Sequence, residues 1–127
     1  MIVMLNGPFG VGKSTVAKLL RQQIPESVVY NPEWAGSVLM RLPKCMFKGA
    51  GTDDFQDIQL WRTSVVAGVK LFGRVVSGPI IVPMTFSSRD YFDEVLEGMR
   101  RNDPELNVFC LRASLPAISK RLAIRNV

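Results

Sequence analysis

The sequence predicts an α/β fold in which a parallel β-sheet is flanked by helices. Apolar runs of strand length alternate along the chain with segments whose apolar residues recur at helical spacing. Successive predicted strands are separated by enough residues to hold a helix, and crossovers of this kind join parallel strands. The predicted order is β α β α α β α β α, in one domain of 127 residues.

The chain opens with a strand, a glycine-rich loop and a helix. Residues 1–5 are an apolar run that stops at Asn6 and Gly7, as a buried parallel strand does where it enters a loop. A helix is predicted over residues 13–23, because apolar residues recur at helical spacing until Pro25 ends the segment.

A short strand and a helix are predicted next. Residues 27–30 are rich in strand-forming side chains, and residues 33–42 can form a helix that stops before Pro43. Residues 44–51 are expected to be a loop.

A long helix is predicted from Thr52 to Gly78. Thr52 suits the N-cap, and Asp53 and Asp54 suit the positive end of a helix. The sequence Gly78-Pro79 ends the helix. Its apolar face carries Phe55, Ile58, Trp61, Val65, Val69, Phe72 and Val76, so Trp61 and Phe55 are expected in the core rather than at a ligand.

The last part of the chain contains two further strand–helix pairs. Residues 80–82 form a buried strand closing at Pro83, and Ser87 and Asp90 have capping-box spacing ahead of a helix that ends near Arg101. The second pair is a strand over residues 106–111 and a helix that Ser114 caps, carrying Ile118 and Leu122.

The charge of the chain favours anionic ligands in general. Sixteen Lys and Arg against eleven Asp and Glu give a net charge of +5. The basic residues are scattered or lie near the C-terminal end, without interleaved aromatic residues, so no nucleic-acid partner is predicted. With no His in the chain, a proton acceptor has to be a carboxylate, Lys, Tyr, Cys or water.

Two cysteines, Cys45 and Cys110, do not make a disulfide framework in a domain of this size, which indicates a reducing, cytoplasmic setting. The N-terminus lacks the pattern of a signal peptide, and no apolar run approaches the length of a membrane span. We therefore expect neither export by that route nor a transmembrane segment.

The segment from Gly7 to Thr15 matches the pattern GxxxxGK[ST] of a phosphate-binding P-loop, between a predicted strand and a predicted helix. Glycines let consecutive backbone N–H groups point at phosphate oxygens, and the following helix adds its positive end. We expect ATP and Mg²⁺ here. The expected nucleotide-binding residues are Gly7 at the start of the loop, the amides of Gly10, Val11 and Gly12, the Lys13 ammonium on the β and γ phosphates, the Ser14 hydroxyl on Mg²⁺ and Thr15 on the α-phosphate.

No Walker B carboxylate follows the strand at residues 80–82, which argues against a switch GTPase or a motor ATPase. A small kinase can take carboxylates from other loops, and Glu33 and Asp54 are the candidates for the catalytic acid or base. The alternatives stay open: Glu33 could be a solvated charge, and Asp53 and Asp54 could only complement the helix dipole.

Arg121 and Arg125 stand four residues apart and are predicted to share a helix face opposite Ile118 and Leu122. They could clamp the nucleotide or the migrating phosphoryl group, or form a basic surface. Gln56 and Arg62 lie off the apolar stripe of the long helix, and with Asn31 and Asp53 they are the candidate substrate-binding residues.

Several segments together resemble the tunicamycin resistance protein family, which is similar in fold to small-molecule kinases such as chloramphenicol phosphotransferase and shikimate kinase. The segments are NGPFGVGKST, VVYNPEWAG, DDFQDIQLWR, IIVPMTFSSRDYF and LRASLPAISKRLAIR. The resemblance implies a nucleoside-monophosphate-kinase-like fold, ATP with Mg²⁺, and resistance to the uridine-containing antibiotic tunicamycin. It also implies that Arg121 and Arg125 lead into a mobile lid.

The sequence departs from this family pattern at two places. Asn31 stands where such kinases tend to carry an acid, and the chain ends where the lid should begin, so we expect a single domain over residues 1–127 that lacks its lid and last strand.

The first hypothesis is an ATP-dependent phosphotransferase acting on a small hydroxylated acceptor. The alternatives are a protein that sequesters the drug without chemistry and a kinase with a metabolic substrate.

Overall fold

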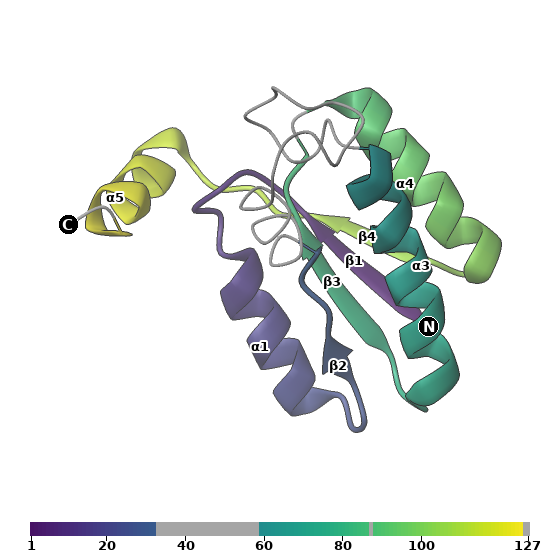
Figure 1. Cartoon of the computed structure of the whole chain (residues 1–127). Coiled ribbons are helices and arrows are strands. Elements are labelled where there is room, and N and C mark those ends of the chain that lie inside the picture. The colour runs from purple at the N-terminus through teal and green to yellow at the C-terminus, as the bar shows by residue number, and fades with distance from the viewer. Residues whose placement is uncertain (33–58, 87, 126–127) are drawn as a thin grey trace, which may run out of the picture.

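The computed structural model describes residues 1–32, 59–86 and 88–125. Within these residues the chain forms a four-stranded sheet with helices on both faces (Figure 1), and no described helix is long and apolar enough to cross a membrane. The elements are β1 (Ile2–Asn6), α1 (Lys13–Gln23), β2 (Val28–Val29), α3 (Gln59–Val75), β3 (Ile80–Met84), α4 (Arg89–Asn102), β4 (Asn107–Cys110) and α5 (Leu115–Arg125).

The sheet is parallel throughout, with strand order β2-β3-β1-β4. Strand β1 pairs with β3 from Ile2↔Ile80 to Asn6↔Met84, and on its other edge it pairs with β4 as far as Asn6↔Cys110. Because β1 is hydrogen-bonded on both edges, the point where the chain leaves it at Asn6 is fixed on both sides. The predicted parallel α/β architecture is confirmed.

The two faces of the sheet are covered by different helices. Side chains of alternate residues point to opposite faces of a strand, so Ile2 and Met4 lie under α3 and α4 whereas Val3 and Leu5 lie under α1. The larger cluster adds Trp61, Val65 and Val69 from α3, Val95 and Met99 from α4, and Ile80, Val82 and Met84 from β3. The smaller cluster adds Ala17 and Ile81.

Trp61 anchors α3 to the end of β2. Its side chain is fully buried, and its indole N–H donates to the Pro32 carbonyl oxygen at 3.0 Å. The prediction that Trp61 belongs to the core is confirmed. Phe72, predicted on the same face, instead lies at the rim, 39% exposed, where its ring contacts Tyr30 at 5.1 Å between centroids. Phe55, Ile58 and the predicted start of this helix fall outside the described residues.

Strand β3 continues through Pro83 to Met84, so the prediction that Pro83 closes the strand is wrong. Ile80 donates its N–H to β1, at the Met1 carbonyl oxygen, whereas Ile81 faces β2 and accepts from Tyr30 N–H. The backbone groups of alternate residues in a strand point to opposite neighbouring strands, so those of Pro83 point to the β2 side, as those of Ile81 do. Strand β2, however, has already ended at Val29. The missing N–H of Pro83 therefore removes no ladder bond to β2.

The N-cap of α4 is Ser88 and not Ser87, which corrects the predicted capping box. The Ser88 hydroxyl oxygen accepts a hydrogen bond from Asp90 N–H at 3.2 Å, and Ser87 itself is outside the described residues. At α5 the predicted cap is confirmed, because Ser114 Oγ accepts from Ala117 N–H at 3.3 Å. The predicted bounds of α1 agree with the structure at both ends.

Two turns pack together at the sheet edge where the strands begin. Gly78 precedes β3, and its backbone lies so close to Glu26, in the turn between α1 and β2, that a Cβ at Gly78 would overlap the Glu26 carbonyl group. The contact is supported by the Ser77 hydroxyl, which donates to the Glu26 carboxylate at 3.0 Å. Only glycine fits at this position without moving one of the turns.

Gly78→Ala is expected to destabilise the fold by about 1–3 kcal/mol, because the added methyl group meets backbone that cannot rotate away. Gly73→Ala in α3 is the matched control, since a Cβ there meets nothing within 4 Å. It is expected to stabilise the helix by up to about 1 kcal/mol. Urea unfolding of both variants measures the difference, and equal midpoints would contradict the packing described for Gly78.

Candidate functional site

The loop from Gly7 to Gly12 lies at the edge of the sheet where the strands end, between β1 and α1. Gly10 and Gly12 have φ angles of 83° and 106°, a left-handed region that side chains rarely adopt. Gly12 is the N-cap of α1, and no side chain caps that helix or places an acidic group in its first turn. The backbone N–H groups and the positive end of α1 therefore face the loop without a neutralising side chain.

Lys13 is held inside the loop. Its side chain is only 8% exposed, and its ammonium donates to the carbonyl oxygens of Gly7 and Pro8, both at 2.9 Å. The Phe9 ring lies 5.5 Å from the same nitrogen. These contacts keep a positive charge beside the loop amides, where a phosphate group would meet both.

The start of the loop is supported by the two strands beside β1. Thr85, directly after β3, donates its hydroxyl to the Gly7 carbonyl oxygen at 2.8 Å. A Cβ at Gly7 would lie 3.1 Å from the carbonyl oxygen of Leu111, which follows β4, and 2.9 Å from Val11. The sequence pattern indicates only that no carboxylate follows this strand, and it does not reveal the contact of Thr85 with Gly7.

Helix α5 rests on the far side of the loop, set apart from the sheet (Figure 1). The Arg121 guanidinium donates to the carbonyl oxygens of Gly10 and Val11, both at 3.2 Å. Ile118 and Leu122 meet the same glycine, since a Cβ at Gly10 would lie 3.1 Å from Leu122 and 3.3 Å from Ile118. The prediction that Arg121 faces away from Ile118 and Leu122 is wrong, because residues three and four apart are neighbours on a helix.

A cavity of about 580 Å³ opens between the loop, the first turn of α1 and α5. Its volume is in the range of small-molecule sites. Apolar side chains form part of its wall and the Arg121 guanidinium adds a positive charge, a combination suited to an aromatic base joined to phosphates. The lining residues are Gly10, Val11, Gly12, Thr15, Val16, Arg121 and Ile124.

Ser14 and Thr15 occupy the first turn of α1 with exposed side chains. A hydroxyl is a ligand that Mg²⁺ accepts together with phosphate oxygens. Among the described residues no group of three or more Asp, Glu, His or Cys could hold a metal ion by itself. The Ser14 hydroxyl is therefore suited to a metal ion that arrives with a triphosphate.

Arg62 lies at the start of α3 and is held against α4. Its Nε donates to the Glu94 carboxylate at 2.6 Å, and its guanidinium lies over the Tyr91 ring, 4.3 Å from the centroid. The Arg62 side chain is 13% exposed. Asn31 follows β2 and is partly buried, at the edge of the sheet where the strands end.

Several predicted site residues cannot be located. Glu33, Asp53, Asp54 and Gln56 fall outside the described residues, and so does the side chain of Arg125. The structure therefore brings together the loop residues and Arg121, and it leaves the predicted carboxylates as predictions.

Known structures give the context for this site, whereas no protein-family model and no curated protein matches the chain. The structure is similar to the Deinococcus radiodurans tunicamycin resistance protein, with a TM-score of 0.80 and 27% identity over 99% of this chain and 71% of that one. The expected resemblance is thereby confirmed.

Two kinases are more distant. A sugar kinase from Janibacter sp. gives a TM-score of 0.68 at 16% identity over 96% of this chain, and a gluconokinase from Sinorhizobium meliloti gives 0.59 at 18% over 97%. This chain covers 65% and 63% of their lengths, so it spans less than two thirds of either kinase. At these identities the likeness shows the fold, which is that of P-loop kinases.

Arg121→Ala is expected to loosen α5, because the Arg121 contacts join this helix to the loop. Removing two hydrogen bonds of a charged donor at a partly exposed site is expected to cost about 1 kcal/mol. Hydrogen exchange of the α5 amides should then quicken by roughly fivefold, from the exponential relation between free energy and population. The control is Lys120→Ala, at an exposed neighbouring position of the same helix. Equal exchange rates of the α5 amides in both variants would contradict the role of Arg121 in holding α5 to the loop.

Proposed function

We propose that this chain binds ATP with Mg²⁺ in the Gly7–Thr15 loop and transfers the terminal phosphoryl group to a hydroxyl of a small acceptor. One observation carries the proposal. The Lys13 ammonium, the left-handed glycines Gly10 and Gly12 and the uncapped end of α1 converge on one loop. The kinase-like fold supports the same reaction class.

The loop residues bind and orient the phosphates in this proposal. The amides between Gly10 and Lys13 donate to phosphate oxygens, and the Lys13 ammonium exchanges its bonds to Gly7 and Pro8 for bonds to phosphate. Since the loop amides are fixed before the nucleotide binds, they stabilise the charge that develops on the transferred group without reorganising.

Ser14 and Thr15 complete the binding of the nucleotide. Mg²⁺ bound with the triphosphate neutralises part of its charge, and the Ser14 hydroxyl would hold the ion. Thr15 lies at the mouth of the cavity beside α5, where its hydroxyl can reach a phosphate oxygen, and Arg121 places a second positive group across that cavity.

The acceptor we propose is a nucleoside antibiotic of the tunicamycin type. The proposal rests on the similarity to the Deinococcus protein, whose name states resistance to tunicamycin. Glu33 or Asp54 would orient the acceptor hydroxyl and take its proton, since Asn31 cannot accept one at neutral pH. Asp53, Gln56 and Arg62 are the proposed acceptor contacts, and Arg125 would join Arg121 at the phosphates.

A second candidate is sequestration of the drug without chemistry. It is favoured by Asn31 after β2 and by Thr85 after β3, two positions where a carboxylate would serve catalysis. A third is a kinase with a metabolic acceptor. For each of them we propose a cytoplasmic location, where ATP is present and the exposed thiol of Cys110 stays reduced.

Lys13→Ala is expected to weaken ATP binding by about 100-fold, because a charge-assisted contact to phosphate is lost in a nearly buried site. Isothermal titration with Mg·ATP measures the change. Lys18→Ala, at an exposed position of the same helix, should bind as the unmodified chain does. Equal affinity of the Lys13 and Lys18 variants would remove the P-loop assignment.

Release of ADP is expected to depend on the acceptor. In a coupled assay with the full chain and Mg·ATP, addition of tunicamycin should raise ADP release at least tenfold above the rate without acceptor, which is the behaviour of a transferase rather than an ATPase. A rate that no acceptor changes would sink the transferase proposal. Protection in a one-to-one ratio with protein, with no ADP formed, would support sequestration.

A further inference from the structure

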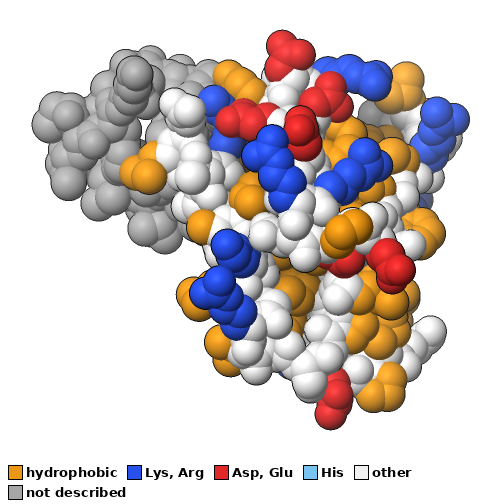
Figure 2. All heavy atoms as spheres, turned by 90° about the vertical axis from the view of Figure 1, so that its right-hand side faces the viewer, with side chains coloured by type: hydrophobic (Ala, Val, Ile, Leu, Met, Phe, Trp, Pro, Cys, Tyr) orange, Lys and Arg blue, Asp and Glu red, His pale blue; other side chains and the backbone are white. Residues whose placement is uncertain are grey.

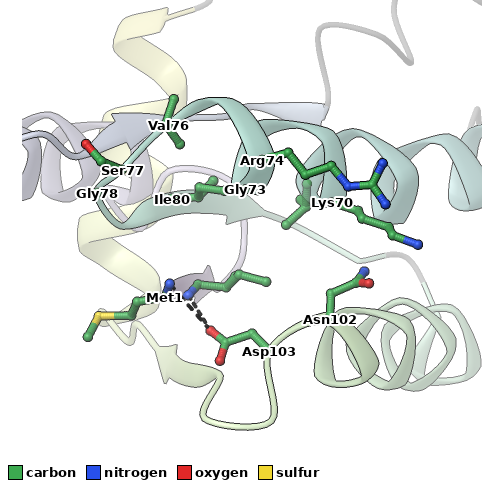
Figure 3. A pocket seen from close by; sticks show the side chains of 12 residues that line it. Met1, Lys70, Gly73, Arg74, Val76, Ser77, Gly78, Ile80, Asn102 and Asp103 are labelled. Atoms are coloured by element: carbon green, nitrogen blue, oxygen red, sulfur yellow. Dashed lines mark hydrogen bonds and ion pairs between the residues drawn. The ribbon is translucent and has the colours of Figure 1, made fainter.

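A second cavity lies at the opposite edge of the sheet, where the strands begin (Figure 3). It has a volume of about 400 Å³, which is in the range of small-molecule sites, and lies between the last turns of α3 and the end of α4. Strand β1 leads from Ile2 at this cavity to Asn6 at the P-loop, a length of roughly 13 Å. A small ligand here is therefore too far from the P-loop to contact a phosphate bound there.

The floor of this cavity is apolar and rigid. Ile2, Val69 and Ile80 come from β1, α3 and β3, and none of these residues is more than 4% exposed. On the face that α3 and α4 form, charged side chains gather over the upper part, and the lower part shows hydrophobic side chains with further charged ones among them (Figure 2). Because these side chains are almost completely covered, a ligand in the cavity meets mainly the polar and charged groups of its walls.

Gly73 widens the cavity at a cost to α3. Glycine in a helix interior is less stable than alanine by about 1 kcal/mol. Packing explains two other glycines, because a Cβ at Gly68 would meet the Tyr30 hydroxyl and one at Gly98 would lie 2.9 Å from Val66. At Gly73 a Cβ would meet nothing within 4 Å. Because glycine has no side chain, it lets a ligand come close to the backbone, and this role fits Gly73.

Two cations stand on the wall beside Gly73. Lys70 and Arg74 are one helical turn apart, and Figure 3 shows both side chains pointing to the same side, above Asn102 of α4. Within the described residues no ion pair joins either cation to an acidic group. Like charges at this spacing disfavour the helix by a few tenths of a kcal/mol, so an anion between them would relieve a repulsion.

The acidic group at this cavity is already engaged. The Asp103 carboxylate accepts a hydrogen bond from Ile2 N–H at 2.7 Å and lies 3.9 Å from the Met1 amino group. Asp103 and the amino group offset each other, and the Glu26 carboxylate accepts from the lining residue Ser77, so no ion pair of the described residues engages Lys70 or Arg74. The ends of α3 and α4 add partial negative charge, which is smaller than that of two full cations.

We infer that this cavity binds a small organic anion, with its carboxylate or phosphate group on Lys70, Arg74 and the Asn102 amide. The rest of the ligand lies against the backbone of Gly73. Arg and Lys with an amide donor bind either kind of anion. This second site is independent of the proposed transferase reaction.

The test is a titration of the isotopically labelled full chain with benzoate and, separately, with phenyl phosphate, followed by the backbone amide resonances. Mg·ATP is present so that the P-loop is occupied. Saturable shifts at Gly73 and Gly78 are expected, without matching shifts at Gly10 and Gly12. A response to benzoate alone identifies carboxylates, and a response to phenyl phosphate alone identifies phosphates. Shifts confined to Gly10 and Gly12, or no saturable shift with either probe, would overturn the inference.

Two variants separate binding in the cavity from binding elsewhere. Gly73→Leu fills the cavity with a good helix former, so it should fold and abolish the shift at Gly78. Lys70→Gln with Arg74→Gln should weaken binding at least tenfold, whereas Lys18→Gln with Arg21→Gln, two exposed cations of α1, should leave it unchanged. An undiminished shift in the folded Gly73→Leu chain, or equal weakening by both charge pairs, would contradict the site.

Discussion

The Lys13 ammonium bound to the Gly7 and Pro8 carbonyl oxygens is the interaction on which the rest of the site depends. It closes the loop on itself and keeps a nearly buried positive charge beside the amides that begin α1. The loop can hold this shape because β1 is paired on both edges and delivers Gly7 to a fixed point. Thr85 and Arg121 then hold the loop from β3 and from α5.

The features that the sequence predicts well are those set by neighbouring residues. The bounds of α1 follow from its apolar spacing and from Pro25, and the P-loop is marked by its glycines, of which Gly10 and Gly12 have left-handed φ angles in the structure. The buried position of Trp61 follows from the stripe of α3. In each case the residues that decide the outcome lie within one or two helical turns of one another.

The features that the sequence does not predict depend on residues that are distant in the chain. Pro83 stays in β3 because β2 has already ended beside it, which no local pattern encodes. Thr85 and Arg121 meet the loop across 78 and 111 positions. The cavity at the other edge of the sheet brings together residues that are distant in the chain, since Met1 and Asp103 lie together there. In the sequence alone Lys70 and Arg74 look like ordinary surface charges, and only the fold shows that they line this cavity.

The central claim is that the loop binds ATP in order to transfer a phosphoryl group to the acceptor. The most direct test is the mass of tunicamycin after incubation with the protein and Mg·ATP, beside the Lys13→Ala variant. The account predicts a product heavier by one phosphoryl group, formed with the unmodified protein and not with the variant. A drug of unchanged mass, with ATP bound to the protein, would contradict the proposed transfer to this acceptor.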